Sequence, residues 1–234
     1  MQSDIDEHKS LARLVQENPM RARVFESRGL DFCCGGKQSL SEACQKEGFE
    51  LDSLRQELAE VDEQSESEES VEFSSLIELV DHIEKTHHDY LRDELGPLGD
   101  LVAKVENAHG GRHPELHELA EAFETLAGEL PVHLSEEEQI LFPAVRHLEG
   151  HGVSSVEGKT ARELLQGLEQ DHDKTAGCLE KIRRLTDDFE VPDDACPSYR
   201  NMLARLEELE RDIHMHVHRE NNVLFPEVRN RLSK

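Results

Sequence analysis

One block of this sequence occurs twice, and both copies carry side chains that can bind metals. The stretch from His133 to Val145 returns as the stretch from His216 to Val228, with His, Glu, Leu, Phe, Pro and Val repeating at one fixed offset. A His-Asp pair that begins at His88 returns at nearly the same offset. Residues four apart share one face of a helix, so each His-x-x-x-Glu would present an imidazole beside a carboxylate. The recurring set that can converge in a helical bundle is His88, His133, Glu137, His172, His216 and Glu220.

The recurring residues lie on apolar helix faces. His172 falls on a stripe with Leu168 and Ile182, and Glu137 falls on a stripe with Leu130 and Leu141. A carboxylate that faces a core is costly unless it is paired or binds a metal. A single core histidine is usually structural, and a single His-x-x-x-Glu is often a surface pair. Duplication of the whole set, in register and on apolar stripes, favours metal binding over both of these readings.

The donor set indicates the kind of metal. Two histidines for each ion, with two carboxylates that bridge both ions, supply about four ligands per ion, an arrangement known from di-iron helical bundles. A bridging oxide or hydroxide would add a fifth ligand and leave room for a small molecule. Nitrogen and oxygen donors without a thiolate suit iron or manganese better than a structural zinc site. We therefore predict a carboxylate-bridged, oxo- or hydroxo-bridged pair of ions.

Other histidines near the recurring set are interpreted differently. Helical periodicity is compatible with an inward His87 or an inward His88, and the repeated His-Asp pair selects His88. His214 and His218 flank His216 on other helix faces, so we interpret them as surface residues or as supports for the ligands.

The elements that must position these residues are helices. Helical periodicity predicts four long helices, and strand signals are absent, so the fold class is all-α. Short connections between the helices favour an up-down-up-down four-helix bundle. Pro131 predicts a kink, whereas Pro143 and Pro226 follow the two His-x-x-x-Glu turns and would either set the pitch of those turns or end the helices. The predicted helices cover residues 74–104, 115–148, 158–187 and 197–231.

A separate small helical domain precedes the bundle. We predict it at residues 1–61, followed by an acidic linker at 62–72 and the bundle at 73–234. Cys33 and Cys34 lie in a loop between a helix that ends at Gly29 and one that opens at Ser39. The next helix N-terminus and Lys37 would lower a thiol pKa there and favour the thiolate. Such thiolates could hold iron, reduce the metal centre or react with nitric oxide; the alternative is that both cysteines are small buried apolar residues.

Composition excludes several classes of function. Fifty-two acidic residues against 26 basic ones give a formal net charge of −26, which repels nucleic acids and anionic lipids. No apolar run is long enough to span a membrane, and the polar start does not resemble a secretory signal. The five cysteines show no disulfide pattern, so we expect a cytoplasmic protein.

The four-helix part resembles the hemerythrin-like bundles. The Asp-Phe-Cys-Cys-Gly-Gly-Lys-Gln loop, together with Glu-Glu-Gln-Ile-Leu-Phe-Pro and Glu-Asn-Asn-Val-Leu-Phe-Pro, resembles a narrower family. These are the iron–sulfur cluster repair di-iron proteins, or repair-of-iron-centres proteins. The resemblance implies two iron ions and a vicinal cysteine pair at Cys33 and Cys34. It also implies that Glu129 and Asp171 line the path of iron or support the ligands, although Asp171 is one methylene shorter than the expected glutamate. The implied iron ligands are His88, His133, Glu137, His172, His216 and Glu220.

The resemblance also implies a function. The leading hypothesis is repair of iron–sulfur clusters damaged by nitrosative or oxidative stress, by donation of iron, with damaged iron–sulfur proteins as recipients and nitric oxide or oxygen as small ligands. The first alternative is an enzyme that reduces nitric oxide at the di-iron centre. The second is a module that binds or senses oxygen or nitric oxide. We expect no nucleic-acid or membrane partner. A homodimer is a further hypothesis, which rests on no feature of the sequence.

Overall fold

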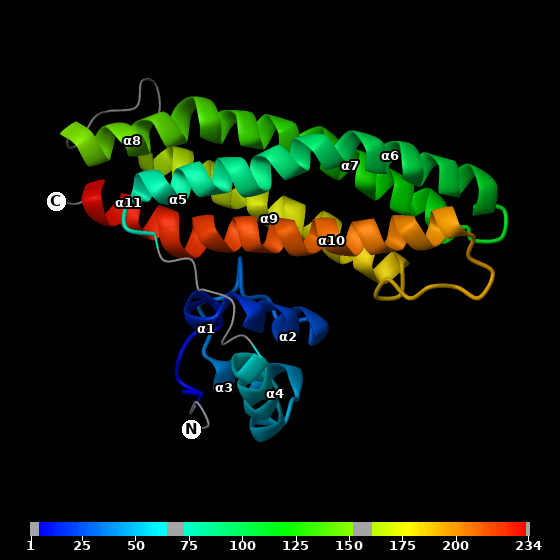
Figure 1. Ribbon diagram of the computed structural model, residues 1–234, viewed down its shortest axis with the longest axis horizontal. Coiled ribbons are helices and arrows are strands. Elements are labelled where there is room, and N and C mark those ends of the chain that lie inside the picture. Colours follow the sequence, from blue (N-terminus) through cyan, green and yellow to red (C-terminus); the bar gives the residue numbers. More distant parts are fainter. Residues whose placement is uncertain (1–4, 65–72, 152–160, 233–234) are drawn as a thin grey trace.

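Four helical rods form a bundle, and a small helical unit packs against one side of it (Figure 1). The computed structural model describes residues 5–64, 73–151 and 161–232. No strand occurs in these three ranges, where Ser10 and Ser39 form a single isolated bridge. The all-α prediction is confirmed.

The rods are close to those that periodicity predicts. The first rod runs through residues 76–109, the second through 115–151 and the fourth through 197–232; they are the continuous helices α5–α6, α7–α8 and α10–α11. The third rod is α9, Ala161–Leu185, and the predicted residues 158–160 lie outside the described part of the chain. Their segments are α5 (Leu76–Ile83), α6 (Asp89–His109), α7 (Glu115–Glu136), α8 (Phe142–His151), α10 (Pro197–Arg219) and α11 (Phe225–Leu232).

Three rods contain a π-helical turn, which the sequence did not reveal. These turns are η2 (Glu84–His88), η3 (Glu137–Leu141) and η4 (Glu220–Leu224). Each turn adds a residue to the helical hydrogen-bond ring, and such turns are frequent at functional sites. Each one starts or ends on a predicted ligand. The rods continue past Pro143 and Pro226, so the interpretation that these prolines end the helices is wrong. The widened turn before each proline accommodates a ring that would otherwise clash with the preceding carbonyl.

The bundle core has two apolar parts. One contains Ile83, Leu141, Leu168 and Leu224 near the end formed by α5, α8 and α11. The other contains residues such as Leu130, together with apolar side chains of the small unit. The six predicted ligands come between these two parts along the rods. None of the helices in the described ranges is long and apolar enough to cross a membrane.

The small unit consists of short helices around a buried arginine. Arg21 donates to Asp62 through Nε at 2.8 Å and Nη2 at 2.6 Å, and to the Leu14 carbonyl at 3.1 Å. Asp62 lies within α4, so the first residues of the expected linker are helical, while residues 65–72 lie outside the described ranges. The helices are α1 (Leu11–Glu17), η1 (Pro19–Arg21), α2 (Ala22–Ser27), α3 (Leu40–Glu47) and α4 (Leu51–Gln64).

The cysteine loop, residues 29–39, requires one glycine for steric reasons. A Cβ atom on Gly36 would lie 2.1 Å from the Phe32 carbonyl oxygen, so no other residue fits there. The Gly36 carbonyl accepts a hydrogen bond of 2.9 Å from the Ala12 N–H, which fastens the loop to α1. Ser39 and Glu42 then form the predicted capping box at the start of α3.

Replacing Arg21 should destabilise the small unit strongly. Arg21→Ala leaves Asp62 without its main partner, and breaking a buried pair in this way costs about 3–5 kcal/mol. Arg23→Ala is the matched control, because Arg23 is exposed on the same helical segment and should change stability by less than about 0.5 kcal/mol. Urea denaturation of both variants measures the difference. Equal stability of the two variants would contradict the role given to Arg21.

Candidate metal centre

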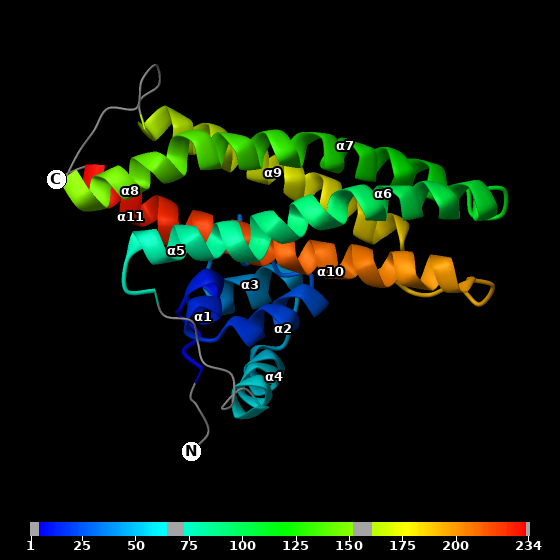
Figure 2. The same ribbon diagram turned by 45° about the horizontal axis from the view of Figure 1, so that its top comes forward.

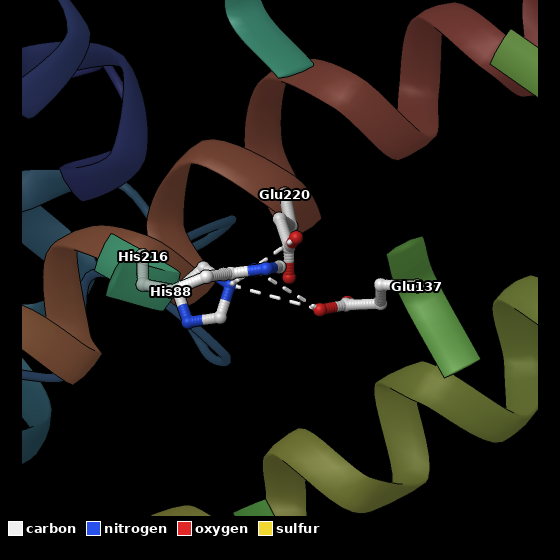
Figure 3. Close-up of side chains that lie close together, drawn as sticks. All are labelled: His88, Glu137, His216 and Glu220. Atoms are coloured by element: carbon white, nitrogen blue, oxygen red, sulfur yellow. Dashed lines mark hydrogen bonds and ion pairs between the residues drawn. The ribbon is translucent and has the colours of Figure 1, made fainter. Parts of the chain in front are cut away.

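The six predicted ligands meet inside the bundle at the level of the three π turns. Glu137, Glu220 and His88 are completely buried, and His172 and His216 are 1% exposed. The most exposed member is His133, at 6%. Figure 3 shows how side chains from three rods turn toward one another in one half of this site.

The six residues divide into two groups that share both glutamates. One group is His88, Glu137, His216 and Glu220, and the other is His133, Glu137, His172 and Glu220. Within each group the potential ligand atoms lie within 4.8 Å of one another. The sharing of both glutamates is what a pair of carboxylate-bridged ions requires.

Each glutamate turns one oxygen toward each histidine pair. Glu137 Oε2 lies 3.4 Å from His88 Nε2, and its Oε1 lies 3.3 Å from His133 Nε2. Glu220 Oε1 lies 3.2 Å from His216 Nε2, and its Oε2 lies 3.1 Å from His172 Nε2. Both carboxylates are therefore oriented to span two positions rather than to bind at one.

The nitrogen and oxygen atoms of the site are arranged as ligands for cations rather than as a hydrogen-bond network. His88 Nε2 and His216 Nε2 are 3.2 Å apart, and His133 Nε2 and His172 Nε2 are 3.0 Å apart, so the imidazoles point their nitrogens at each other in pairs. All four glutamate oxygens are buried without a standard hydrogen bond from the described residues. Buried polar groups in native proteins are almost always satisfied. A cation within each group would satisfy both nitrogens and both carboxylates, so the residues fit a dinuclear metal site.

Two of the imidazole rings form hydrogen bonds with neighbouring side chains through Nδ1, the nitrogen that faces away from the other ligands. His88 Nδ1 lies 2.7 Å from Glu138 Oε1, and Arg92 donates to the same oxygen at 2.5 Å. His172 Nδ1 lies 2.9 Å from Asn221 Oδ1. Because a carboxylate and an amide oxygen only accept, both rings carry their proton on Nδ1 and leave Nε2 free for a metal.

The repeated phenylalanines support the same two rings by stacking. Phe142 lies on His88, with ring centroids 5.4 Å apart, and Phe225 lies on His172 at 5.8 Å with the planes only 6° apart. Both phenylalanines are completely buried. This contact explains why Leu-Phe-Pro occurs in both copies of the repeat: each copy supports a histidine from another rod.

The charges within the site are strongly coupled. Burial lowers the pKa of His133, but the carboxylates of Glu137, Glu220 and Asp171 outweigh burial and raise that pKa to about 9. Burial acts against ionisation of Glu220, yet His216 and His172 hold its pKa well below the ordinary value. The glutamates are therefore ionised, as metal-binding carboxylates must be, whereas without a metal His133 keeps a proton at neutral pH.

Several residues near the ligands differ from their interpretation in the sequence. His87 is buried as well as His88, and it stacks on His216 with ring centroids 5.6 Å apart. His218 is 2% exposed, so its interpretation as a surface residue is wrong; its Nδ1 donates to the Phe32 carbonyl at 3.3 Å. Periodicity could have signalled His87, whereas the burial of His218 depends on the small unit that covers α10.

Glu129 and Asp171 have weaker links to the site. Asp171 is half-buried, lies 3.9 Å from His133 Nδ1 and accepts from Lys174 at 2.7 Å. Glu129 is exposed on α7. Their role on the path of iron stays a prediction.

The two cysteines lie at the contact between the small unit and the bundle. Cys33 is buried and Cys34 is half-buried, with their sulfurs 4.0 Å apart. A hydrogen bond with the Cys34 thiol, burial and the Asp31 carboxylate raise the pKa of the Cys33 thiol well above its ordinary value. The prediction that Lys37 and a helix N-terminus lower that pKa is therefore wrong for Cys33. The Asp31 carboxylate stabilises the loop from within, because its Oδ1 accepts hydrogen bonds from the backbone N–H groups of Cys33 and Cys34.

Two asparagines after Glu220 join the cysteine loop to the metal centre. Asn221 accepts from His172 through Oδ1, and its Nδ2 lies 3.9 Å from Cys34 Sγ. Asn222 Nδ2 donates to the Cys33 carbonyl at 2.8 Å. Cys34 is thus connected to a predicted iron ligand through one amide. Figure 2 shows the small unit beside the rod formed by α10 and α11, where these contacts occur.

Comparison with known proteins shows which domain families the two parts of the chain match. Residues 79–228 match the family model described as the hemerythrin HHE cation-binding domain, which contains all six predicted ligands. Residues 7–62 match a domain of unknown function named ScdA_N.

Relatives over nearly the whole chain define the family. The iron–sulfur cluster repair protein ScdA of Staphylococcus haemolyticus is 32% identical over 92% of this chain and 95% of its own length. The iron–sulfur cluster repair protein YtfE of Musicola paradisiaca is 34% identical over 93% of this chain and 95% of its own. The iron–sulfur cluster repair protein YtfE of Yersinia pseudotuberculosis is 32% identical over 94% of this chain and 96% of its own length. The chain belongs to this family of iron–sulfur cluster repair proteins, and the resemblance stated from the sequence is confirmed.

Removing a shared ligand should affect metal binding more than removing an unshared one. Glu137→Gln takes a charged oxygen from both groups, so we expect loss of both ions, whereas His88→Ala removes a ligand from one group only. Glu136→Gln is the matched control, because Glu136 is the neighbouring residue and belongs to neither group. Metal analysis of the purified variants measures the ratio of metal to chain. Equal losses in Glu137→Gln and Glu136→Gln would contradict the assignment.

Metal uptake should release protons near neutral pH. The raised pKa of His133 means that the metal-free protein holds this proton below about pH 9, and coordination must displace it. Metal affinity should therefore rise with pH until that pKa is passed. The stabilisation that this proton gives the metal-free fold is present at low pH and is lost through the same range. Calorimetric metal titrations in buffers with different ionisation enthalpies measure the release. A pH-independent affinity would contradict the coupling.

Proposed function

We propose that this protein repairs iron–sulfur clusters damaged by nitrosative or oxidative stress, and that it does so by donating iron bound between Glu137 and Glu220. The names of its relatives, iron–sulfur cluster repair proteins, support the repair role. The observation that carries the iron-donation step is the contact from His172 through Asn221 to Cys34. It connects a thiol loop, through one amide, to one of the proposed iron ligands.

The six ligands are suited to hold two iron ions, and iron bound there would supply the material and the redox activity that cluster rebuilding needs. Iron–sulfur clusters are bound by thiolates, whereas this site offers only nitrogen and oxygen donors. A site of this kind can give up its ions to the thiolates of a recipient protein. The two shared carboxylates keep the site anionic and attract cations back into it when they are available.

His133 is the ligand best suited to leave first. It is the most exposed of the six, and its Nδ1 has no hydrogen-bond partner among the described residues. Asp171, 3.9 Å away, favours the protonated ring. A proton taken up at Nε2 of His133 would compete with coordination and open one side of the site, whereas Asn221 and Phe225 keep the ring of His172 in place.

The cysteine pair is suited to receive iron from the neighbouring site or to give an electron to it. Cys34 is the more accessible of the two thiols, and the Asn221 amide points a donor at its sulfur. Asp31 and Gly36 hold the loop in one conformation, so the thiol keeps its position when the site is opened. A thiolate on Cys34 would therefore be close to a cation released from the group of His133 and His172 when His133 leaves.

Nitric oxide turnover at the same site is the second candidate function. Each of the two groups supplies four protein residues, which leaves positions for a small molecule on an octahedral ion. This candidate, like oxygen or nitric oxide sensing, gives no reason for the contact between Asn221 and the cysteine loop. Iron donation accounts for both the ligands and the loop.

Cys33→Ser and Cys34→Ser should reduce repair without loss of bound iron. Each variant is loaded with iron, mixed anaerobically with a nitric-oxide-damaged [4Fe–4S] protein, and followed by the return of cluster absorbance. Cys178→Ser is the matched control, because Cys178 lies on α9 outside the cysteine loop. We expect native repair by the control and slow or absent repair by the two loop variants. Unchanged repair by both loop variants would rule out the proposed role of the thiols.

A further inference from the structure

The residue that precedes two equivalent ligands differs between the halves of the bundle. His87 directly precedes His88, and Asp171 directly precedes the repeated His172. Successive residues of an α-helix point about 100° apart, so the neighbour of an inward ligand normally faces outward. Asp171 does so on the continuous helix α9, where its side chain is 37% exposed. In the first rod the π turn η2 adds a residue to the ring, and both His87 and His88 are buried.

The inward His87 covers the ligand His216. The two rings stack with centroids 5.6 Å apart and planes 15° apart. Both nitrogens of His87 have partners, since Nδ1 lies 2.7 Å from Asp212 Oδ1 and Nε2 contacts Nη1 of Arg219. A guanidinium only donates, so Nε2 accepts, Nδ1 carries the proton and the ring is neutral. His87 therefore supports His216 with a fixed ring that does not repel a cation beside it.

His87, Asp212 and Arg219 also close this side of the metal centre. The three residues line a cavity of about 410 Å³ between the small unit and the bundle, and none of the six ligands lines it. The His87 ring lies between this cavity and His216, because it lines the one and stacks on the other. Solvent that enters the cavity is thus kept from His216.

His133 lacks an equivalent support. Its Nδ1 has no hydrogen-bond partner among the described residues, and the rings that contact it in those ranges belong to two other ligands, His172 and His216. Asp171 Oδ2 lies 3.9 Å from this nitrogen, beyond hydrogen-bond distance, and its other oxygen accepts from Lys174 at 2.7 Å. Of the four imidazole ligands, only His133 has neither a hydrogen bond nor a stacked ring from the described residues outside the ligand set.

We propose that His87 makes the two metal positions unequal. The position beside His88 and His216, the retaining position, holds its ion, whereas the position beside His133 and His172, the exchanging position, gives its ion up. Both positions share the same two glutamates, and each has one imidazole that is hydrogen-bonded through Nδ1 and stacked on a phenylalanine. The difference between them therefore lies at the other imidazole. Where it identifies the ion that is donated, this inference rests on the proposed function.

Release of iron to a chelator distinguishes the two positions. The reduced, iron-loaded, full-length protein is mixed anaerobically with a chelator that forms a coloured ferrous complex. We expect two phases of equal amplitude, because each position holds one ion and the two ions leave at different rates. Release of both ions in a single phase would overturn the proposal.

Variants of His87 test whether this residue sets the slow rate. His87→Ala should accelerate the slow phase about tenfold or more and leave the fast phase unchanged, since loss of a residue that orients a ligand typically costs about 10–100-fold in metal affinity. His87→Phe returns a ring to His216 and should restore the slow phase. His117→Ala is the matched control, because His117 is exposed near the start of α7. An unchanged slow phase in His87→Ala contradicts the proposal, and so does equal acceleration of both phases, which would mean general loosening of the bundle.

Crystals of the unaltered protein, stopped after the fast phase, show which ion remains. Anomalous scattering of iron should give one peak, beside His88 and His216. A remaining peak beside His133 and His172 overturns the proposal, whether or not the His87 variants fold. Neither measurement includes a damaged cluster. A protein that gives its fast ion to the chelator but restores no cluster would refute iron donation and leave the inequality of the two positions standing.

Discussion

Two buried carboxylates inside an apolar bundle are the constraint on which the rest of this structure depends. Glu137 and Glu220 are completely buried, and the groups nearest to their oxygens are four imidazole nitrogens. Ionised groups are not buried at such depth unless positive charge accompanies them. Two cations held between these carboxylates would provide that charge, and the bundle matches the hemerythrin HHE cation-binding domain.

The surroundings of the site are arranged to keep its donors oriented. Three π turns occur at the level of the ligands, and two repeated phenylalanines stack on His88 and His172. Hydrogen bonds that His88 and His172 donate to Glu138 and Asn221 through Nδ1 leave the Nε2 atoms of both rings free for a metal. Asn221 also reaches the cysteine loop, so one side chain takes part in both the bundle and the small unit. Loss of a supporting residue of this kind typically lowers metal affinity or activity about 10–100-fold.

The sequence was sufficient to predict which six side chains meet in the bundle, because duplication in register is visible without coordinates. It also predicted the four rods and the capped helix after the cysteine loop. The π turns were not predictable, since Glu84–His88 has no proline after it and the turn depends on packing against other rods. The burial of His218 depends on the distant Phe32, and the raised pKa of the Cys33 thiol depends on a hydrogen bond with Cys34 and on burial. Periodicity along one helix carries no information about such contacts.

The most direct test of the central claim is the anomalous scattering of iron in crystals of the iron-loaded protein. Data collected on both sides of the iron absorption edge would locate the ions independently of any assumption about the ligands. Our account predicts two peaks between Glu137 and Glu220, one beside His88 and His216 and the other beside His133 and His172. A single peak, or iron bound elsewhere in the bundle, would contradict it.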